Sequence, residues 1–291
     1  MIVYPDIDPI AFRLGPIKVH WYGIMYLLGF ASGWLLGRWR AARPGSTWKA
    51  VDVDDLVFFT MVGGILGGRL GYVLIYGLSF WTAQNPWYPF EVWDGGMSIH
   101  GGFIGAIIAL ALFAWRRGRR VGDVFDFAAP LAPPGLFFGR IGNFINGELW
   151  GKPTTLPWGF IVDPTHLHPS QAGNAISDCG RLGVVPCILH VHASQLYEGF
   201  LEGIVLFIVM WWFTAKPRPR LAPSGVFLVL YGTFRFLIEF VRMPDLQIGY
   251  LAWGWLTMGQ VLSLPMILIG FVLLTYAYNA RASSGNFATA Q

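Results

Sequence analysis

Apolar residues run along the chain in about seven stretches, each close to the roughly 20 residues that a helix needs to cross a bilayer. The stretches lie at residues 19–37, 56–76, 97–115, 121–141, 195–213, 224–241 and 256–278. Pro130, Pro133 and Pro134 interrupt the fourth stretch, so we expect a broken or re-entrant helix there. The pattern predicts an all-α integral membrane protein that forms a single polytopic domain over residues 1–291.

Composition favours the same class of protein. Apolar residues make up 55% of the chain and charged residues 12%, whereas soluble domains average roughly 25% charged residues. A soluble fold with so few charges would expose large apolar patches. The net charge of +4 sits in short clusters between apolar stretches, which argues against a nucleic-acid partner. The amino terminus, MIVYPDIDPI, does not resemble a cleavable signal, so we expect the first span to remain in the protein.

The basic residues predict an orientation. Alternate connections carry twelve lysines and arginines, and the opposite side carries six, three of them in one long segment. Because short cytoplasmic loops hold the excess of positive charge, the amino terminus is expected outside, in the periplasm, and the carboxyl terminus in the cytoplasm. The outward segment 147–194, between the fourth and fifth spans, is rich in proline, glycine and histidine. It is too short for a large core, so we expect a small periplasmic cap.

Ionisable residues inside apolar spans are candidates for function. The densest group lies in GRIGNFINGELWG, residues 139–151. If this segment is helical, Arg140, Asn143 and Asn146 share one face, and Glu148 follows at the exit. An arginine with two amides supplies the donors that a phosphodiester headgroup requires. A purely structural hydrogen-bond network is the alternative interpretation.

The fifth and sixth spans carry further charges. Arg235, Glu239 and Arg242 follow one another at helical spacing in FRFLIEFVR. A self-neutralising pair would let this helix insert, yet two arginines against one carboxylate leave one positive charge for an anionic ligand. Glu198 and Glu202 stand four residues apart in the fifth span and are candidates to pair with arginines on neighbouring helices. For Glu202 we favour a structural role.

Two more residues have both a structural and a functional interpretation. His100, in WDGGMSIHGG, is either a hydrogen-bonded packing residue or a base that takes a proton near neutral pH. The glycine pairs that flank it predict open space around the ring. Arg69, in GGRLGY, is either bonded to backbone carbonyls among closely packed helices or part of a functional site.

Histidines and cysteines gather in the predicted cap. They are His166, His168, His190, His192, Cys179 and Cys187. Their spacing resembles part of a zinc site but fits no standard pattern, so we predict no metal site. The cysteines face an oxidising compartment, which makes a disulfide the alternative. The sequence contains no phosphate loop, dinucleotide fingerprint or nucleophile elbow.

Residues 139–151 resemble the diagnostic motif of the bacterial prolipoprotein diacylglyceryl transferases. Further blocks match that family in order: HWYGIMYLLGF (20–30), GGRLGYVL (67–74), WDGGMSIHGG (93–102), SQLYE (194–198), FRFLIEFVRMPD (234–245) and TMGQ (257–260). Seven spans with an outside amino terminus also agree with the family. One departure is that HPSQLYE of the family reads HASQLYE here, so we align the family's histidine with His192.

The resemblance implies transfer of the diacylglyceryl group from phosphatidylglycerol to the thiol of the lipobox cysteine of preprolipoproteins. The products are a thioether and glycerol phosphate, and the reaction is the first step of lipoprotein maturation. It implies a multi-pass protein of the bacterial inner (plasma) membrane. Its partners would be phosphatidylglycerol, signal peptides that carry a lipobox, and membrane lipids, with no nucleic acid and no cofactor.

The resemblance and the chemistry together predict residue roles. The reaction displaces a phosphate ester from carbon, so Arg140 and Arg235 are expected to bind the phosphate and stabilise its growing charge without a metal. Asn143 and Asn146 are expected to orient the glyceryl group. His100 is the preferred base, because the thiolate rather than the thiol is the nucleophile.

The remaining predicted site residues support these groups. Tyr22, near the outer end of the first span, is expected to position the headgroup, and Arg242 to bind substrate. Glu239 would hold the neighbouring arginine of the sixth span. Glu148 would fix the loop over the site, and Gly151 would allow a tight turn in it.

Three other functions compete with this interpretation. A transporter of small anions or lipids would place the same arginines along a pathway, although transporters usually show internal repeats and paired broken helices. A non-catalytic lipid-binding scaffold would need no candidate base. A different transferase that uses phospholipids would share the bare chemistry.

Overall fold

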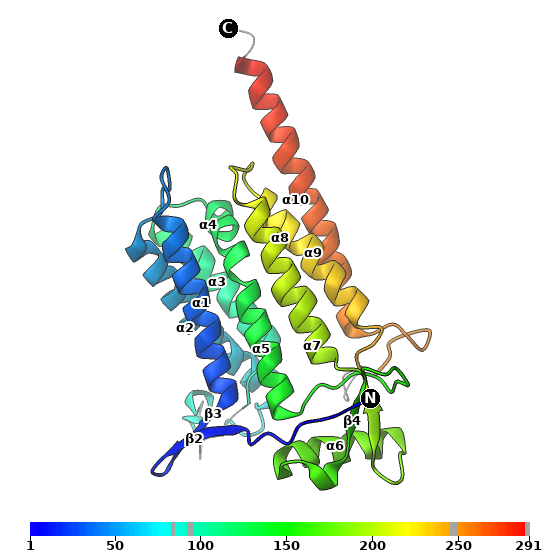
Figure 1. Cartoon of the computed structure of the whole chain (residues 1–291). Helices are drawn as coiled ribbons and strands as arrows, with labels where there is room; N and C mark the ends of the chain where they lie inside the picture. Colours follow the sequence, from blue (N-terminus) through cyan, green and yellow to red (C-terminus); the bar gives the residue numbers. More distant parts are fainter. Residues whose placement is uncertain (83–84, 92–95, 245–248, 289–291) are drawn as a thin grey trace. The chain divides into compact units, whose positions relative to one another are not determined.

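The fold is mainly helical, and its elements follow the apolar pattern of the chain (Figure 1). A computed structural model describes residues 1–82, 85–91, 96–244 and 249–288. Residues 93–95 of the block at 93–102, and Asp245 at the end of the block at 234–245, therefore lie outside the described residues. The chain forms two compact units, one of Met1–Ser32 with Ala129–Gln291 and one of Gly33–Ala128.

Within the described residues, four helical segments are long and apolar enough to cross a membrane. They are α2 (Ala50–Tyr76), α3 (Ile99–Arg116), the continuous segment Ser194–Phe213, and Met258–Ala280 within α10 (Met258–Ala288). α9 (Ala222–Ile238) is apolar but shorter, and α1 (Trp21–Ala41) covers the first predicted stretch. The prediction of a helical membrane protein is confirmed, and the number of seven spans stays a prediction.

The predicted break in the fourth stretch is confirmed. α4 (Val121–Ala128) ends in a 3₁₀ turn, Ala129–Leu131, and α5 (Pro133–Asn146) starts afresh. Pro133 and Pro134 occupy the first turn of α5, where proline needs no amide hydrogen and its fixed φ suits a helix start. The same residues would interrupt the interior of a continuous helix.

In the unit Gly33–Ala128, α2 and α3 pack through glycines at four-residue spacing. A methyl group placed on Gly67 of α2 would lie 2.3 Å from the carbonyl oxygen of Gly101. One on Gly105 of α3 would lie 2.1 Å from the carbonyl oxygen of Gly63. Only glycine permits backbones to approach so closely, as small residues do in membrane helix pairs. The short 3₁₀ helix Tyr88–Phe90 lies between these two helices in sequence.

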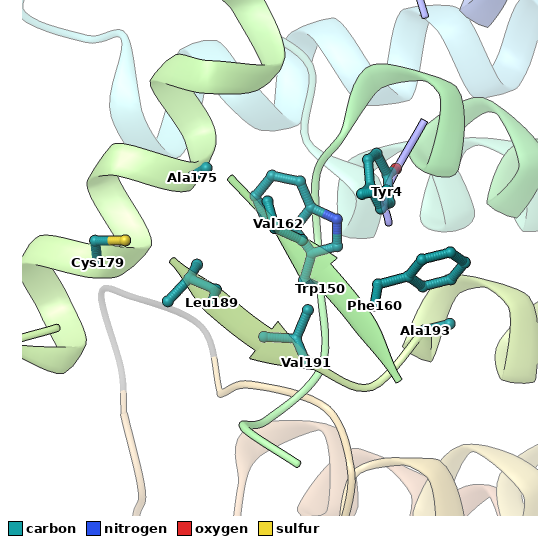
Figure 2. Close-up of a cluster of buried hydrophobic side chains, with 9 residues drawn as sticks. All are labelled: Tyr4, Trp150, Phe160, Val162, Ala175, Cys179, Leu189, Val191 and Ala193. Atoms are coloured by element: carbon teal, nitrogen blue, oxygen red, sulfur yellow. The ribbon is translucent and has the colours of Figure 1, made fainter. Parts of the chain in front are cut away.

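In the other unit, the cap predicted at residues 147–194 builds a small core of its own. β4 (Phe160–Val162) pairs with β5 (Leu189–Val191) in antiparallel fashion. The 3₁₀ turn Pro164–His166 and α6 (Pro169–Leu182) lie between these strands in sequence. Figure 2 shows Trp150 at the centre of the buried side chains of this core.

The amino terminus joins this cap, which the apolar pattern does not predict. β1 (Ile2–Val3) pairs in parallel with β4 and completes a three-stranded sheet in the order β1–β4–β5. Tyr4 is buried against Trp150 and Phe160 (Figure 2), and its hydroxyl donates a hydrogen bond to the carbonyl of Phe144. An exposed hairpin, β2 (Ile10–Leu14) and β3 (Ile17–His20), then leads directly into α1.

Candidate functional site: a buried arginine–glutamate cluster

Three arginines and three glutamates gather in the unit that contains α5 and the helices after it. They are Arg140 on α5, Glu198 at the end of α7 (Ser194–Glu198), Glu202 in the π-helical segment η5 (Gly199–Val205), Arg235 on α9, and Glu239 and Arg242 just after α9. We call these six residues the arginine–glutamate cluster. The glutamates are at most 1% exposed, whereas the side chains of Arg140 and Arg235 are each 15% exposed.

Glu198 is the centre of this cluster. One carboxylate oxygen lies 2.5 Å from Nε of Arg140. The other lies 3.2 Å from Nη1 of Arg235 and 3.5 Å from Nε of Arg242. The carboxylate of Glu198 thus contacts all three arginines, one from α5 and two from α9 and the residues just after it.

Glu239 is the second bridge. It pairs with Nη2 of Arg235 and lies 3.1 Å from Nη1 of Arg242. The hydroxyl of Thr257 donates a hydrogen bond of 2.6 Å to its other oxygen. The predicted role of Glu239 in holding Arg235 agrees with this contact, while its part in catalysis stays a prediction.

The block TMGQ has a structural explanation here. Thr257 directly precedes α10. Its backbone amide donates a hydrogen bond of 3.0 Å to the side-chain oxygen of Gln260. The backbone amide of Gln260 donates a hydrogen bond of 3.3 Å to Oγ1 of Thr257 in return. This is a capping box, which starts a helix by satisfying free amide groups at its first turn. Helix capping therefore also places a hydroxyl against Glu239.

The prediction of one unpaired positive charge in the sixth span is wrong. Arg235 and Arg242 share Glu198 as well as Glu239, and Arg140 contacts both Glu198 and Glu202. With three arginines and three glutamates ionised, the cluster sums to zero. The error arose because spacing along one helix shows only local partners, whereas Glu198 reaches the arginines from another helix.

Close helix packing brings Arg140 to the glutamates. A methyl group on Gly203 would lie 2.6 Å from Cβ of Phe137, and one on Gly199 would lie 3.5 Å from Cβ of Arg140. Gly203 therefore lets η5 approach α5, whereas a methyl group on Gly199 would make only an ordinary van der Waals contact. The π-helical turn, a feature often found at functional sites, carries Glu202 into the interior.

The end of α5 forms a second polar group. Gly147 takes a left-handed conformation (φ 62°) and ends the helix. The side-chain amide of Asn143 donates to Oε1 of Glu148 at 2.8 Å, and that of Asn146 reaches the same oxygen at 3.4 Å. Asn143, Asn146 and Glu148, all predicted from the 139–151 motif, are therefore joined by hydrogen bonds, with the carboxylate of Glu148 accepting from both side-chain amides.

Gly151 does not form the predicted tight turn. Its amide donates to the carbonyl of His192 at 2.9 Å, and it pairs across with Arg242 in a short bridge. A methyl group there would lie 2.6 Å from both Cβ of His192 and the carbonyl oxygen of Val241. Glycine is needed because three chain segments cross at this point, one of them carrying a member of the cluster.

Tyr22 lies against α5 within the same unit. Its hydroxyl is 3.3 Å from that of Tyr26, and its ring occupies the space that a methyl group on Gly142 would need, 2.9 Å away. The tyrosine is half-buried. The structure thus places Tyr22 next to the helix that carries Arg140 and Asn143, while its role in positioning the headgroup stays a prediction.

His100 belongs to the other unit, where it is the second residue of α3 and is exposed. The expectation of open space around the ring is only partly met, because Gly101 packs directly against the backbone of α2. Gly95 lies outside the described residues. The role of His100 as a base stays a prediction.

Arg69 has the structural role that one of its two interpretations predicts. It is 2% exposed, and its guanidinium donates to the carbonyls of Tyr88 (2.6 Å), Gly96 (3.2 Å) and Pro89 (3.4 Å). The ring of Tyr88 also lies under the cation, 4.8 Å from Cζ.

The cap histidines and cysteines form no metal site in the part of the chain that the structure describes, where no three metal-ligating side chains gather. Cys179 and Cys187 are joined in a disulfide, the alternative that the sequence left open. His192 is half-buried, and its Nδ1 lies 3.5 Å from the hydroxyl of Tyr197. Burial lowers the pKa of His192 below its usual value.

Two parts of the site were missed from the sequence. Glu198 was noted only as a possible partner of an arginine, although it is the centre of the cluster. Thr257 was quoted only as part of the TMGQ block, with no role of its own, although its hydroxyl donates to Glu239. The sequence did contain an indication of both residues, since each lies in a block that matches the family: Glu198 ends SQLYE and Thr257 begins TMGQ.

Apolar helices around a buried ionic cluster define an integral membrane protein. Comparison with known proteins identifies the family. The sequence profile described as prolipoprotein diacylglyceryl transferase matches residues 9–276.

Individual relatives agree over nearly the whole chain. The phosphatidylglycerol–prolipoprotein diacylglyceryl transferase of Coxiella burnetii (strain RSA 331) is 54% identical over 281 residues, which cover 97% of this chain and 99% of the relative. Those of Nitratidesulfovibrio vulgaris (strain DP4) and Pseudomonas putida (strain GB-1) are 53% and 51% identical, covering 94% and 98% of this chain and 96% and 99% of the relatives. The chain belongs to the prolipoprotein diacylglyceryl transferase family, as the sequence motifs predict.

Proposed function

We propose that this protein transfers the diacylglyceryl group of phosphatidylglycerol to the thiol of the lipobox cysteine in preprolipoproteins. A thioether forms and glycerol phosphate is released. The observation that carries the proposal is the family membership, because full-length relatives at 51–54% identity bear the name of this activity. The buried arginine–glutamate cluster supplies the chemistry that the reaction needs.

The arginines of the cluster are suited to the phosphate. Arg140 and Arg235 are more exposed than the glutamates that hold them, so their free edges are the part of the cluster that a ligand reaches. Glu198 and Glu239 fix both guanidiniums in place before any ligand arrives. Fixed donors aimed at a leaving phosphate stabilise the charge that grows on it as the carbon–oxygen bond breaks.

The loop that follows α5 is suited to the glyceryl part of the substrate. Asn143 and Asn146 lie on the helix that carries Arg140, and they already converge on Glu148. In the proposed reaction these amides orient the glyceryl group, and Glu148 fixes the loop. Tyr22 packs against the same helix and positions the headgroup, and Gly151 and Arg242 complete the substrate-binding set.

The proposed displacement accounts for each bond and proton. His100 takes the proton of the lipobox thiol, and the thiolate attacks the glyceryl carbon that bears the phosphate oxygen. The new carbon–sulfur bond forms as the carbon–oxygen bond breaks, and the bonding electrons leave with the phosphate. No cofactor takes part in these steps.

We also propose seven spans in the bacterial inner membrane, with the amino terminus and the cap in the periplasm, the carboxyl terminus in the cytoplasm and the whole chain acting as one membrane domain. The distribution of lysine and arginine supports this orientation. So does the disulfide of the cap, since disulfides persist in oxidising compartments.

The test uses purified protein with phosphatidylglycerol and a lipobox peptide. The expected products are the thioether-modified peptide and glycerol phosphate, detected by mass spectrometry. If neither forms with correctly folded protein, the proposed function is wrong. Lipid flux in proteoliposomes without product would favour the transporter alternative.

Variants of the same assay test the roles. Arg235→Ala removes one side of the proposed phosphate clamp and is expected to abolish most transfer, so full activity in this variant contradicts the clamp. His100→Gln is expected to slow transfer and to change its pH profile. An unchanged rate and profile would mean that another group is the base.

A further inference from the structure

Glu202 is the least satisfied member of the arginine–glutamate cluster. It is fully buried, and neither of its carboxylate oxygens accepts a hydrogen bond from any described residue. Its ion-pair contact is a single long one, 3.6 Å from Nη2 of Arg140. Glu198 by contrast contacts three arginines, and Glu239 contacts two arginines and accepts a hydrogen bond from Thr257.

The charged and titratable groups that face Glu202 come from three elements. They are Arg140 on α5, Glu198 on α7, and Tyr231 and Arg235 on α9. Without a ligand the six charges of the cluster cancel. A phosphodiester carries one negative charge, so its binding to Arg140 and Arg235 would leave this buried site with one uncompensated negative charge. Burying an unpaired charge is costly, and groups in such places change their protonation instead.

We propose that Glu202 takes up one proton when the phosphodiester of phosphatidylglycerol binds, and that this keeps the occupied cluster neutral. The inference rests on the proposed function. The proton comes from water and returns to water when glycerol phosphate leaves. Among the three glutamates, Glu202 receives the proton because it has the fewest contacts to lose. Protonation also ends its attraction for Nη2 of Arg140 and leaves that group free for the phosphate.

Glu202 is therefore a positioning residue that acts through Arg140. The coupling between lipid binding and protonation of Glu202 has a definite sign. Because the bound state holds one more proton than the free state, the affinity for phosphatidylglycerol falls as pH rises, by up to about tenfold per pH unit. The phosphodiester of the lipid stays ionised across the neutral range, so the change belongs to the protein.

Calorimetry on the full-length protein in detergent tests the proposal directly. Short-chain phosphatidylglycerol is titrated, without peptide, in two buffers of different ionisation enthalpy, which gives the number of protons taken up per lipid bound. Wild-type protein is expected to take up as much as one proton, and the dissociation constant is expected to rise with pH. Glu202→Gln, a neutral side chain of similar size, is expected to bind with no proton uptake and with a dissociation constant that does not change with pH.

Glu198→Asp is the matched control, since it keeps a carboxylate one turn away on the same helical segment but shortens its side chain. It is expected to weaken binding at every pH while proton uptake persists, because the charge of the cluster is unchanged and Glu202 still titrates. If Glu202→Gln takes up protons as wild type does, or if Glu198→Asp binds lipid without proton uptake, the proposal is overturned. Absence of phosphatidylglycerol binding by wild-type protein would instead contradict the proposed function.

An infrared measurement avoids any folding defect of the variants. The difference spectrum between free and lipid-bound wild-type protein is expected to show a new band of a protonated carboxyl group. Binding without such a band overturns the proposal, whatever the variants do.

Discussion

Arg69 and the arginines of the cluster show two ways of holding a guanidinium inside apolar helices. Arg69 donates to three backbone carbonyls and is almost completely sealed from the surface. Arg140 and Arg235 are held by carboxylates and keep a larger part of their side chains exposed. Carbonyls satisfy hydrogen-bond donors without cancelling the charge, whereas carboxylates do both.

The difference teaches how a structural arginine is told from a functional one. Both kinds are polar residues inside apolar spans, so their position in the sequence does not separate them. What separates them is how much of the guanidinium side chain is exposed and which groups hold it in place. Carbonyls surround the guanidinium of Arg69, while glutamates hold Arg140 and Arg235 and leave part of each side chain exposed, which is the part that the proposed phosphate would contact.

The largest expected effect comes from removing the centre of the cluster. Glu198→Ala leaves Arg140, Arg235 and Arg242 short of one carboxylate, and losing one partner of a buried ionic network costs about 3–5 kcal/mol. Thermal or denaturant unfolding in detergent measures this loss. The double variant Glu198→Leu with Arg242→Met is expected to be less destabilised than the sum of the two single changes, because it removes both charges together. Additive losses would mean that this pair is not coupled.

Arg235→Lys tests whether geometry matters beyond charge. Lysine keeps the positive charge but cannot contact Glu198 and Glu239 through two separate groups as arginine does. Transfer activity is expected to fall by roughly 100-fold or more, in line with the loss of one fixed donor. Arg69→Lys, the control from the other unit, is expected to leave the rate per folded molecule nearly unchanged. Equal losses in both variants would erase the distinction between the two kinds of arginine.

Arg69→Leu isolates the structural role. Three carbonyls would lose a charged donor, and about 1–3 kcal/mol of stability is expected to go with them. Below its lowered melting temperature, the variant is expected to keep the lipid affinity of wild type. A changed affinity with unchanged stability would instead assign Arg69 to substrate binding.

Two glycine substitutions are expected to cost about as much stability as Arg69→Leu. Gly105→Ala presses a methyl group against the backbone of α2, and Gly203→Ala presses one against Phe137 of α5. Overpacking of this kind typically costs about 1–3 kcal/mol. Only Gly203→Ala is expected to lower transfer activity as well, because it displaces the helix that carries Arg140. Unfolding and transfer measured on both variants separate packing from function.

The sequence predicted features that depend on neighbours in the chain. Pro133 and Pro134 predicted the restart of a helix, and the apolar stretches predicted the helices themselves. The run from Arg140 to Glu148 predicted a polar group at the end of a helix, because residues three to five apart meet there.

The identity of contacts between distant segments was not predicted. The expectation that Glu198 and Glu202 pair with arginines on neighbouring helices is confirmed, but nothing near Glu198 indicates that one partner is Arg235, which lies 37 residues later on another helix. The residues next to Gly151 in the sequence also do not indicate its close approach to Val241, and the glycine was therefore assigned to a turn. Pairing between helices depends on packing of the whole unit, which the period of one helix does not contain.

The parallel pairing of β1 with β4 sets an order of events during synthesis. Ile2 leaves the ribosome before its partner Phe160, which follows about 160 residues later. At about 5–20 residues per second, the first strand waits roughly 8–30 seconds for its sheet. During that time Tyr4 has no Trp150 or Phe160 to pack against. The growing chain therefore completes its cap only after four of the proposed spans have been made, so the segment at Ile2 waits for strands that are synthesised much later.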